Sequence, residues 1–335
     1  MNSLRLELER SAVSPLIEVR NLVKHFDARR RFFGDRSGPV RAVDDVSFVI
    51  APGETLGLIG ESGCGKSTLA RVMLGLTPAT SGEVLLEGNN SINLKGAERR
   101  KFRRACQIIF QDPLGALDPR QKVGDAVAEA LEVHDIEHGV EAKECAAELF
   151  KQVGLRPELM RLYARELSGG QRQRVLIARA LAVKPKFLVA DESVSALDVS
   201  VQAQIINLLQ DLQDEFGLTY LFIAHGLAVV RQISDRVGVM YLGSLVEVAP
   251  SGELFAAPAH PYTKGLIAAV PIPDPARRRP RLLITDDVQS VVNIIGGCRF
   301  RRRCPLASEL CEKTEPRLRE ISPQHWVACH FAEEG

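Results

Sequence analysis

The stretch that decides the fold is Gly60-Glu61-Ser62-Gly63-Cys64-Gly65-Lys66-Ser67-Thr68, which fits the pattern G-x-x-x-x-G-K-[ST]. It lies between an apolar run at Thr55–Ile59 and a run typical of a helix at Leu69–Leu76. Glycines in such a loop let successive backbone N–H groups point at an anion, and the positive end of the following helix attracts the same charge. A glycine-rich turn that binds nothing is the alternative. The strand–loop–helix context favours a nucleotide-phosphate site, in which Lys66 reaches the β- and γ-phosphates and Ser67 binds Mg²⁺.

Length and composition exclude several classes of protein. The chain has 335 residues, which suits one large domain with a smaller appendage. Its formal net charge of +1 gives no general attraction to polyanions, so we expect no nucleic-acid partner. No stretch approaches the roughly 18 apolar residues of a membrane span, and the mixed charges at the N-terminus do not fit a signal peptide. We therefore expect a cytosolic protein whose seven cysteines stay reduced unless they bind metal.

Hydrophobic patterning predicts alternating strands and helices. Strands are expected at 16–20, 42–50, 55–59, 187–190, 219–224 and 237–241. Helices are expected throughout 124–166, with breaks near Gly139 and Gly154, over 201–216, and from Leu227 onward. This alternation favours a largely parallel sheet covered on both faces. The basic stretch 99–104 is expected to be a solvated helix face, 27–39 an exposed loop, and the proline-rich segments 257–262 and 271–275 a break before a tail.

A second set of charged residues follows a predicted strand. The apolar run Phe187–Ala190 ends in two carboxylates, Asp191 and Glu192. In phosphate-loop enzymes an acid at this place completes the Mg²⁺ shell, and a neighbouring carboxylate can polarise the attacking water as a general base. We therefore predict Asp191 as a metal ligand and Glu192 as the base. Such a pair is weak evidence on its own, since many acidic residues cap a following helix.

The segment Leu167-Ser168-Gly169-Gly170-Gln171 matches a family signature. With it, the sequence resembles the nucleotide-binding subunits of ATP-binding-cassette (ABC) transporters. The resemblance implies that the Ser168 hydroxyl and the backbone N–H groups of a helix beginning at Gln171 bind a γ-phosphate. In the family that phosphate is held by the phosphate loop of the opposite subunit, so that two cassettes enclose two ATP molecules.

Further motifs of this family occur in the same order along the chain. Ile109–Pro113 resembles the Q-loop, in which Gln111 would contact Mg²⁺ and the water, and Ser195–Asp198 resembles the D-loop, in which Asp198 would contact the partner cassette. His225 resembles the switch histidine that contacts the γ-phosphate. Phe26, or alternatively His25, would supply the aromatic face for adenine. Each residue alone is more often structural, but six motifs in order predict an ATPase.

The resemblance also implies a fold class and a division into domains. The expected fold is α/β: a P-loop NTPase of the ABC type, with a RecA-like, mostly parallel sheet, a β subdomain and a helical subdomain at about 112–176. We expect an N-terminal tail over 1–15, the nucleotide-binding domain over 16–257, and a small cysteine-containing C-terminal extension over 258–335.

Within this family the chain is most similar to the ATPase subunits of oligopeptide/dipeptide permeases, over nearly its whole length. Val43–Phe48, Met240–Gly243 and His260–Lys264 carry this likeness, and 114–120 with 270–275 resemble the second of the two ATPases of such permeases. The resemblance implies uptake of peptides at the cytoplasmic face of the cell membrane. The implied partners are a sister ATPase in a heterodimer, two membrane permeases and an extracytoplasmic solute-binding protein. One alternative is import of nickel, opines or sugars by an ATPase of the same subfamily. The contrasting hypothesis is a soluble ABC protein that acts on ribosomes or DNA and takes no part in transport.

The chain departs from the family pattern at two positions. Ser193 stands where the family often has proline after the catalytic glutamate, and Gly226 stands where it often has aspartate after the switch histidine. Neither change removes a group that touches ATP, so we expect activity to remain.

Four of the seven cysteines fall in the last forty residues: Cys298, Cys304, Cys311 and Cys329. Four thiolates in a cytosolic protein favour tetrahedral Zn²⁺ or an iron–sulfur cluster, and a small domain with reduced cysteines or disulfides is the alternative. The resemblance implies a [4Fe–4S] cluster. We expect it to be structural, because the arginine-rich tail has little apolar material for a core.

Overall fold

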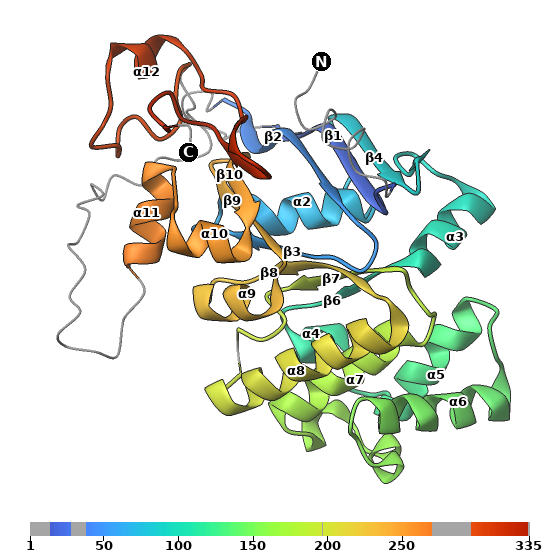
Figure 1. Cartoon of the computed structure of the whole chain (residues 1–335). Helices are drawn as coiled ribbons and strands as arrows, with labels where there is room; N and C mark the ends of the chain where they lie inside the picture. Colours follow the sequence, from blue (N-terminus) through green and yellow to red (C-terminus); the bar gives the residue numbers. More distant parts are fainter. Residues whose placement is uncertain (1–13, 28–37, 196, 270–295, 334–335) are drawn as a thin grey trace, which may run out of the picture. The chain divides into compact units, whose positions relative to one another are not determined.

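The computed structural model describes residues 14–27, 38–195, 197–269 and 296–333 (Figure 1). Two compact units make up the chain. The first is formed by residues 1–51, 56–92 and 230–335, and the second by residues 52–55 and 93–229. The phosphate loop and the cysteine-bearing tail therefore belong to the first unit.

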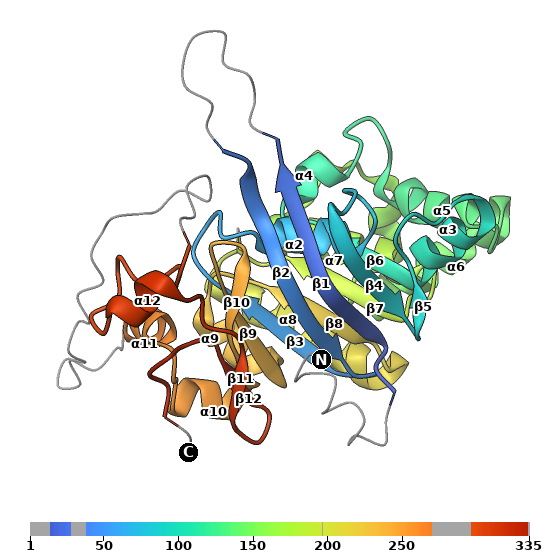
Figure 2. The same cartoon turned by 90° about the horizontal axis from the view of Figure 1, so that it is seen from above.

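The first unit contains an antiparallel sheet near the N-terminal end of the chain. Its strand order is β2-β1-β4-β5, with bounds β1 (Ile17–Phe26), β2 (Val40–Ile50), β4 (Ser81–Leu86) and β5 (Asn89–Asn90) (Figure 2). Ile17 and Val19 of β1 are buried at alternate positions. Asn21 has a φ of 43°, and the strand register shifts there, so that Leu22 is buried instead of the next alternate residue. Strand β1 is longer than the segment 16–20 that the sequence predicted.

A second group of strands in the first unit carries the phosphate loop and the tail. Their bounds are β3 (Thr55–Ile59), β9 (Arg236–Tyr241), β10 (Ser244–Pro250), β12 (His325–Val327) and β11 (Arg319–Ser322). Strand β3 pairs in parallel with β9, whereas β9, β10, β12 and β11 pair antiparallel in that order. The helices of this unit are α2 (Lys66–Met73), α10 (Ser251–Ala256), α11 (Pro261–Ala268) and α12 (Glu309–Lys313). Strands β11 and β12 form a hairpin in the cysteine-bearing tail, called the tail hairpin below. It continues the sheet of β9 and β10 through pairs such as Val248 with Trp326.

The second unit has three parallel strands in the order β8-β7-β6, with bounds β6 (Cys106–Ile109), β7 (Phe187–Asp191) and β8 (Thr219–Ile223). Leu188, Val189 and Ala190 of β7 have no exposed surface, as expected for a strand covered on both faces. Full burial of such a Leu or Val side chain contributes roughly 1.5–3 kcal/mol.

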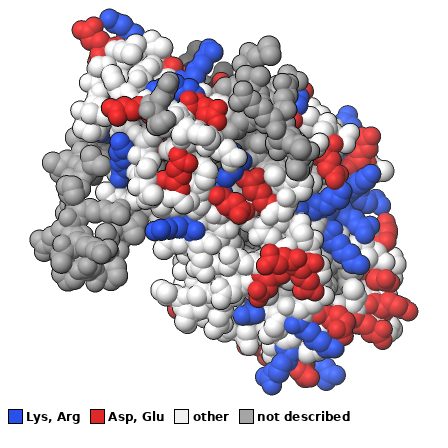
Figure 3. Space-filling view, viewed as in Figure 1, with Lys and Arg blue, Asp and Glu red and all other residues white. Residues whose placement is uncertain are grey.

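The helices of the second unit agree in part with the predicted positions: the range 124–166 holds α-helix up to residue 152 and only short 3₁₀ turns beyond it, and the short helix over 113–116 was not predicted. They are α3 (Gly96–Ala105), α4 (Pro113–Ala116), α5 (Val123–Val133), α6 (Gly139–Gln152), α7 (Gly169–Leu181) and α8 (Val199–Phe216), with 3₁₀ turns η1 (Pro157–Arg161) and η2 (Ala164–Glu166). Helix α9 (Leu227–Ile233) follows β8 in the chain. The basic stretch 99–104 lies on α3, where Phe102 is buried and the five cationic side chains are exposed. Figure 3 shows a group of Lys and Arg side chains at the place of this helix. This confirms the predicted solvated helix face.

Three expectations need correction. The helix predicted at Leu69–Leu76 begins at Lys66 and ends at Met73, because the phosphate lysine is itself the first helical residue. The helix predicted to begin at Gln171 begins at Gly169, because Ser168 caps it. The sheet is parallel at β3 with β9 and at β6–β8, but β10, β11 and β12 add antiparallel strands. Most of the predicted loop 27–39 and the segment 271–275 lie outside the described residues.

Candidate nucleotide site

Three glycines shape the phosphate loop, which follows β3. Gly60, Gly63 and Gly65 have φ values of 152°, 77° and 113°, in the region that favours glycine. A Cβ on Gly60 would lie 2.2 Å from the Met240 carbonyl oxygen, and one on Gly65 would lie 2.0 Å from the Ala42 carbonyl oxygen. The loop can therefore fold against β9 and β2 only with glycine at these two positions.

Lys66 is held inside this loop. Its side chain is buried, and Nζ donates hydrogen bonds to the carbonyl oxygens of Gly60 at 2.7 Å and Glu61 at 3.1 Å. It also lies 3.7 Å from the Cys64 Sγ, and burial raises the pKa of that thiol, so the cysteine stays neutral. The lysine is the cation that this loop offers to an incoming phosphate. Ser67 and Thr68, at the start of α2, are half-buried, and Ser62 lies at the exposed tip.

The proposed adenine face lies at the end of β1. The Phe26 side chain is exposed, and the Lys24 Nζ lies 4.7 Å from the centre of its ring. His25 is engaged elsewhere, since its Nε2 lies 2.9 Å from the Asp44 Oδ1. The structure therefore leaves Phe26 as the more accessible of the two candidates, and its role stays a prediction.

In the second unit, parallel pairing brings four predicted residues to one edge. Ile109 of β6 pairs with Ala190 of β7, and Asp191 pairs with Ile223 of β8. Each strand ends at this edge, because parallel strands share their carboxyl ends. The residues that follow are Gln111 after β6, Asp191 and Glu192 at the end of β7, and His225 after β8. Parallel α/β sheets bind ligands at this edge.

Glu192 and His225 contact each other directly. The His225 Nε2 lies 2.6 Å from the Glu192 Oε1, and the Glu192 side chain is 11 % exposed. Glu192 has a φ of 49°, which is strained for a residue with a Cβ. Its backbone N–H donates to the Ile223 carbonyl at 2.9 Å, and its own carbonyl accepts from Ser195. The surrounding structure thus fixes the carboxylate in one place, as a general base requires.

The signature segment forms a capped helix start. The Ser168 Oγ accepts a hydrogen bond from the Gln171 N–H at 3.3 Å, and the Gln171 Oε1 accepts one from the Ser168 N–H at 2.9 Å. The Ser168 hydroxyl keeps its own proton for another acceptor. A Cβ on Gly170 would lie 2.5 Å from the Val201 Cγ1, so glycine lets α7 pack closely against α8.

Asp198 has a structural role that the sequence did not predict. Its carboxylate caps α8, accepting hydrogen bonds from the Val201 N–H at 3.0 Å and the Ser200 Oγ at 2.7 Å. These hydrogen bonds lower the pKa of Asp198. Its contact with a partner cassette stays a prediction, and Ala196 in the same segment lies outside the described residues.

The two departures from the family pattern differ in their surroundings. Ser193 is buried, and its Oγ has no hydrogen-bond partner within the described part of the chain. A Cβ on Gly226 would lie 3.6 Å from the Val229 Cγ2, an ordinary contact, so the backbone there does not require glycine.

The four tail cysteines lie near one another. All seven cysteines of the chain are free. Burial, together with the neighbouring thiols Cys311, Cys304 and Cys329, raises the pKa of Cys298 to about 11. Among the described residues, however, no three or more His, Cys, Asp or Glu side chains are grouped as a metal site. The structure therefore does not support the metal predicted for this tail.

Comparison with known proteins decides the family. The family described as "ABC transporter" matches residues 43–195, and the one described as "Oligopeptide/dipeptide transporter, C-terminal region" matches residues 246–311. YkfD of Bacillus subtilis (strain 168) is 50% identical over 320 residues, which cover 95% of each chain. The chain belongs to the ABC transporter ATPase family. AppF of the same strain, named as an oligopeptide transport ATP-binding protein, is 46% identical over 319 residues, 94% of this chain and 97% of AppF.

A solved ABC structure has the same fold. The dimeric ATP-binding cassette MJ0796, bound to ADP and Pi in a post-hydrolysis state, superposes with a TM-score of 0.61 at 28% identity and covers 70% of this chain and 98% of its own. The predicted fold class and family are thus confirmed, and the chain is an ABC ATPase that uses ATP and Mg²⁺. Of the helices in the described ranges, none is long and apolar enough to span a membrane.

Proposed function

We propose that this chain is an ATP-hydrolysing subunit of an importer that takes up peptides. The observation that carries the proposal is the contact between Glu192 and His225 at the end of β7, 2.6 Å from Nε2 to Oε1. The match to the oligopeptide/dipeptide C-terminal region over 246–311 and the name of AppF supply the class of solute.

Each residue of the site has a role in this proposal. Lys66 and the loop N–H groups bind the β- and γ-phosphates. Ser67, Gln111 and Asp191 would hold Mg²⁺, an oxygen donor set that suits this ion, and the ion neutralises phosphate charge when bound. Glu192 accepts a proton from the attacking water, whose oxygen bonds to the γ-phosphorus as the bond to ADP breaks. His225 orients the carboxylate and contacts the γ-phosphate.

The signature of one cassette would complete the site of another. Ser168, Gly169, Gly170 and Gln171 offer a helix N-terminus and a hydroxyl to the γ-phosphate bound by a partner cassette. Asp198 caps helix α8, which packs against α7 where Gly170 faces Val201. We therefore propose a heterodimer with a sister ATPase, beneath two membrane permeases and a solute-binding protein, at the inner face of the membrane. In this proposal residues 16–257 form the nucleotide-binding domain and 258–335 the extension.

The [4Fe–4S] cluster at Cys298, Cys304, Cys311 and Cys329 stays a prediction. Four neighbouring thiols are its chemical support. Anaerobic purification followed by iron, sulfide and zinc assays decides it. About four irons and four sulfides per chain are expected. A single zinc per chain would show a zinc site in place of the cluster, and a chain without metal would refute the cluster.

Reconstitution tests the function. The chain is combined in proteoliposomes with candidate permeases, a sister ATPase and a binding protein from the same organism, and the uptake of labelled di- and oligopeptides, nickel and oligosaccharides is compared. ATP-dependent peptide uptake is expected. Uptake of nickel or an oligosaccharide alone would instead support the alternative importers, and ATP hydrolysis with no uptake would refute an import function.

A further inference from the structure

An arginine of the C-terminal extension reaches the phosphate loop. Arg303, in the turn between Cys298 and Cys304, donates from Nη1 to the Glu61 Oε2 and from Nη2 to the Glu61 Oε1, both at 2.8 Å. Glu61 is the second residue of the phosphate loop. The Arg303 side chain is 8 % exposed and that of Glu61 is 36 % exposed. A two-pronged contact of this kind is more specific than a single ion pair, because both planar groups must be aligned.

The turn that carries Arg303 is itself firmly held. Its backbone N–H donates to the Phe300 carbonyl at 3.0 Å. The Phe300 ring is buried and packs against Tyr241 and Tyr262, with ring centres 5.3 and 5.6 Å away. The Arg303 guanidinium carbon lies 5.8 Å from the centre of the Tyr241 ring and 6.0 Å from that of Phe300. These aromatic contacts favour the charged guanidinium and fix its direction.

Glu61 is also fixed from its backbone. Its N–H donates to the Tyr262 Oη at 2.8 Å, and its carbonyl accepts from the Lys66 Nζ at 3.1 Å. The residue that Arg303 holds is therefore in direct contact with the lysine that binds phosphate. A free Glu61 carboxylate would repel the triphosphate, and it would compete with the triphosphate for the Lys66 ammonium.

We propose that Arg303 is a positioning residue for ATP: it holds the Glu61 carboxylate away from the phosphates and from Lys66. By this contact the C-terminal extension sets the affinity of the phosphate loop for nucleotide. The inference rests on the proposed ATP site at Lys66, and it adds a residue that lies more than two hundred positions away in sequence. Arg303 touches no nucleotide in this proposal and acts through Glu61.

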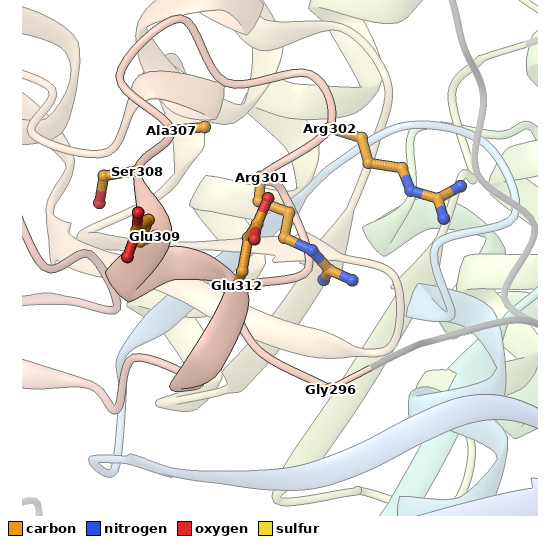
Figure 4. A pocket seen from close by; sticks show the side chains of 7 residues that line it. All are labelled: Gly296, Arg301, Arg302, Ala307, Ser308, Glu309 and Glu312. Atoms are coloured by element: carbon orange, nitrogen blue, oxygen red, sulfur yellow. The ribbon is translucent and has the colours of Figure 1, made fainter.

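The neighbouring Arg302 provides a matched control. It is exposed, and it lines a hollow of about 610 Å³ together with Gly296, Arg301, Ala307, Ser308, Glu309 and Glu312. Figure 4 shows its side chain directed away from the carboxylates of Glu309 and Glu312. This hollow is formed by the extension alone, so replacing Arg302 changes the charge of the turn without touching Glu61.

Binding of Mg-ATP to the full-length chain, measured by isothermal titration calorimetry, tests the proposal. The variants are Arg303→Met, which keeps the aliphatic stem over the aromatic rings, Arg303→Lys, Glu61→Gln, the double variant of Arg303→Met with Glu61→Gln, and Arg302→Met. We expect Arg303→Met to raise the Kd about tenfold and Arg303→Lys to recover part of this loss. Arg302→Met should bind Mg-ATP within about threefold of the parent, and Arg303→Met should have no further effect in the Glu61→Gln background, where residue 61 carries no charge.

Steady-state hydrolysis adds a second readout. Arg303→Met should raise the KM for ATP with little change in kcat, because it alters binding and leaves the reacting groups in place. Parent-like binding by Arg303→Met would overturn the proposal. Equally weak Mg-ATP binding by Arg303→Met and by the double variant would also overturn it, because the loss of affinity would then not depend on the Glu61 carboxylate. If the parent failed to bind Mg-ATP while folded, the ATP site itself would be wrong, a result distinct from either of these.

Discussion

Replacing His325 with glutamine removes an imidazole that lies between two carboxylates of the first unit. The His325 Nε2 lies 2.7 Å from the Glu247 Oε1, and its Nδ1 lies 3.0 Å from the Glu253 Oε1. His325 is on β12 of the tail hairpin, whereas Glu247 is on β10 and Glu253 is on α10. Only the imidazolium form can donate to both carboxylates at once. The ion pairs therefore fasten the tail hairpin to the sheet.

The size and the pH dependence of the effect follow from burial. Glu247 has no exposed surface, and it also accepts hydrogen bonds from the N–H groups of Ala259 and His260. Removing one member of a buried ion pair costs about 3–5 kcal/mol. Burial opposes the charge on His325, but the hydrogen bonds to Glu247 and Glu253 outweigh it and raise the pKa of His325. Its contribution to stability is therefore fully present below the unfolded pKa of about 6.5, and it is lost as the pH rises through the folded pKa.

Urea unfolding between pH 6.5 and 8.5 tests this prediction. Burial lowers the pKa of His260 to about 4, so it is neutral in the folded state throughout this window, and its titration in the unfolded state is common to the parent and the variant. Trp326 is the one tryptophan of the chain and is buried beside His325, so its fluorescence reports on the hairpin. The parent should lose up to about 1.4 kcal/mol of unfolding free energy per pH unit above pH 6.5.

His325→Gln should be about 3 kcal/mol less stable than the parent at pH 6.5 and should lack that slope. His330→Gln, in the same segment, is the control and should keep the slope; the His330 Nε2 lies 3.0 Å from the Thr314 carbonyl oxygen and contacts no carboxylate in the hydrogen bonds of the described chain. An equal slope in the parent and in His325→Gln would refute the reasoning.

Two further predictions concern the glycines of the site. Gly65→Ala places a Cβ 2.0 Å from the Ala42 carbonyl oxygen, so calorimetry should detect no Mg-ATP binding. The control is Gly75→Ala, which is also at positive φ but has open space around it. This control should bind Mg-ATP normally and lose only about 1 kcal/mol of unfolding free energy. Gly170→Ala places a Cβ 2.5 Å from the Val201 Cγ1, so it should retain Mg-ATP binding by the isolated chain but lower hydrolysis by the assembled cassette pair at least tenfold. Normal hydrolysis by Gly170→Ala would contradict the role given to the signature, and binding by Gly65→Ala would contradict the role given to the loop.

Much of the nucleotide site could be predicted because its parts are local. The phosphate loop requires glycine at fixed positions, and the glycines at 60 and 65 have the positive φ and close backbone neighbours that such a loop implies. The buried strand β7 and its two carboxylates were equally visible, since four consecutive apolar residues precede Asp191. Parallel pairing then places Gln111 and His225 at the same edge.

Other features depend on contacts that a sequence pattern does not show. Strands β11 and β12 have only four and three residues, too short for an alternation to be detected. The helix start was predicted at Gln171, but the S-x-x-Q pattern from Ser168 to Gln171, which forms a capping box, could have predicted the start at Gly169. Arg303 was one of several arginines in a basic tail, and only the fold brings it to Glu61. The tail cysteines predicted a metal from their chemistry alone, and the structure does not group them as ligands.

Hydrolysis of Mg-ATP by the assembled cassette pair, compared between the parent and Glu192→Gln, tests the central claim most directly. Glutamine keeps the shape of the side chain but cannot accept the proton of the attacking water. Glu192→Gln should bind Mg-ATP as tightly as the parent and hydrolyse it about a thousandfold more slowly. Hydrolysis by Glu192→Gln at the parent's rate would contradict the assignment of Glu192 as the base and, with it, the account of this site.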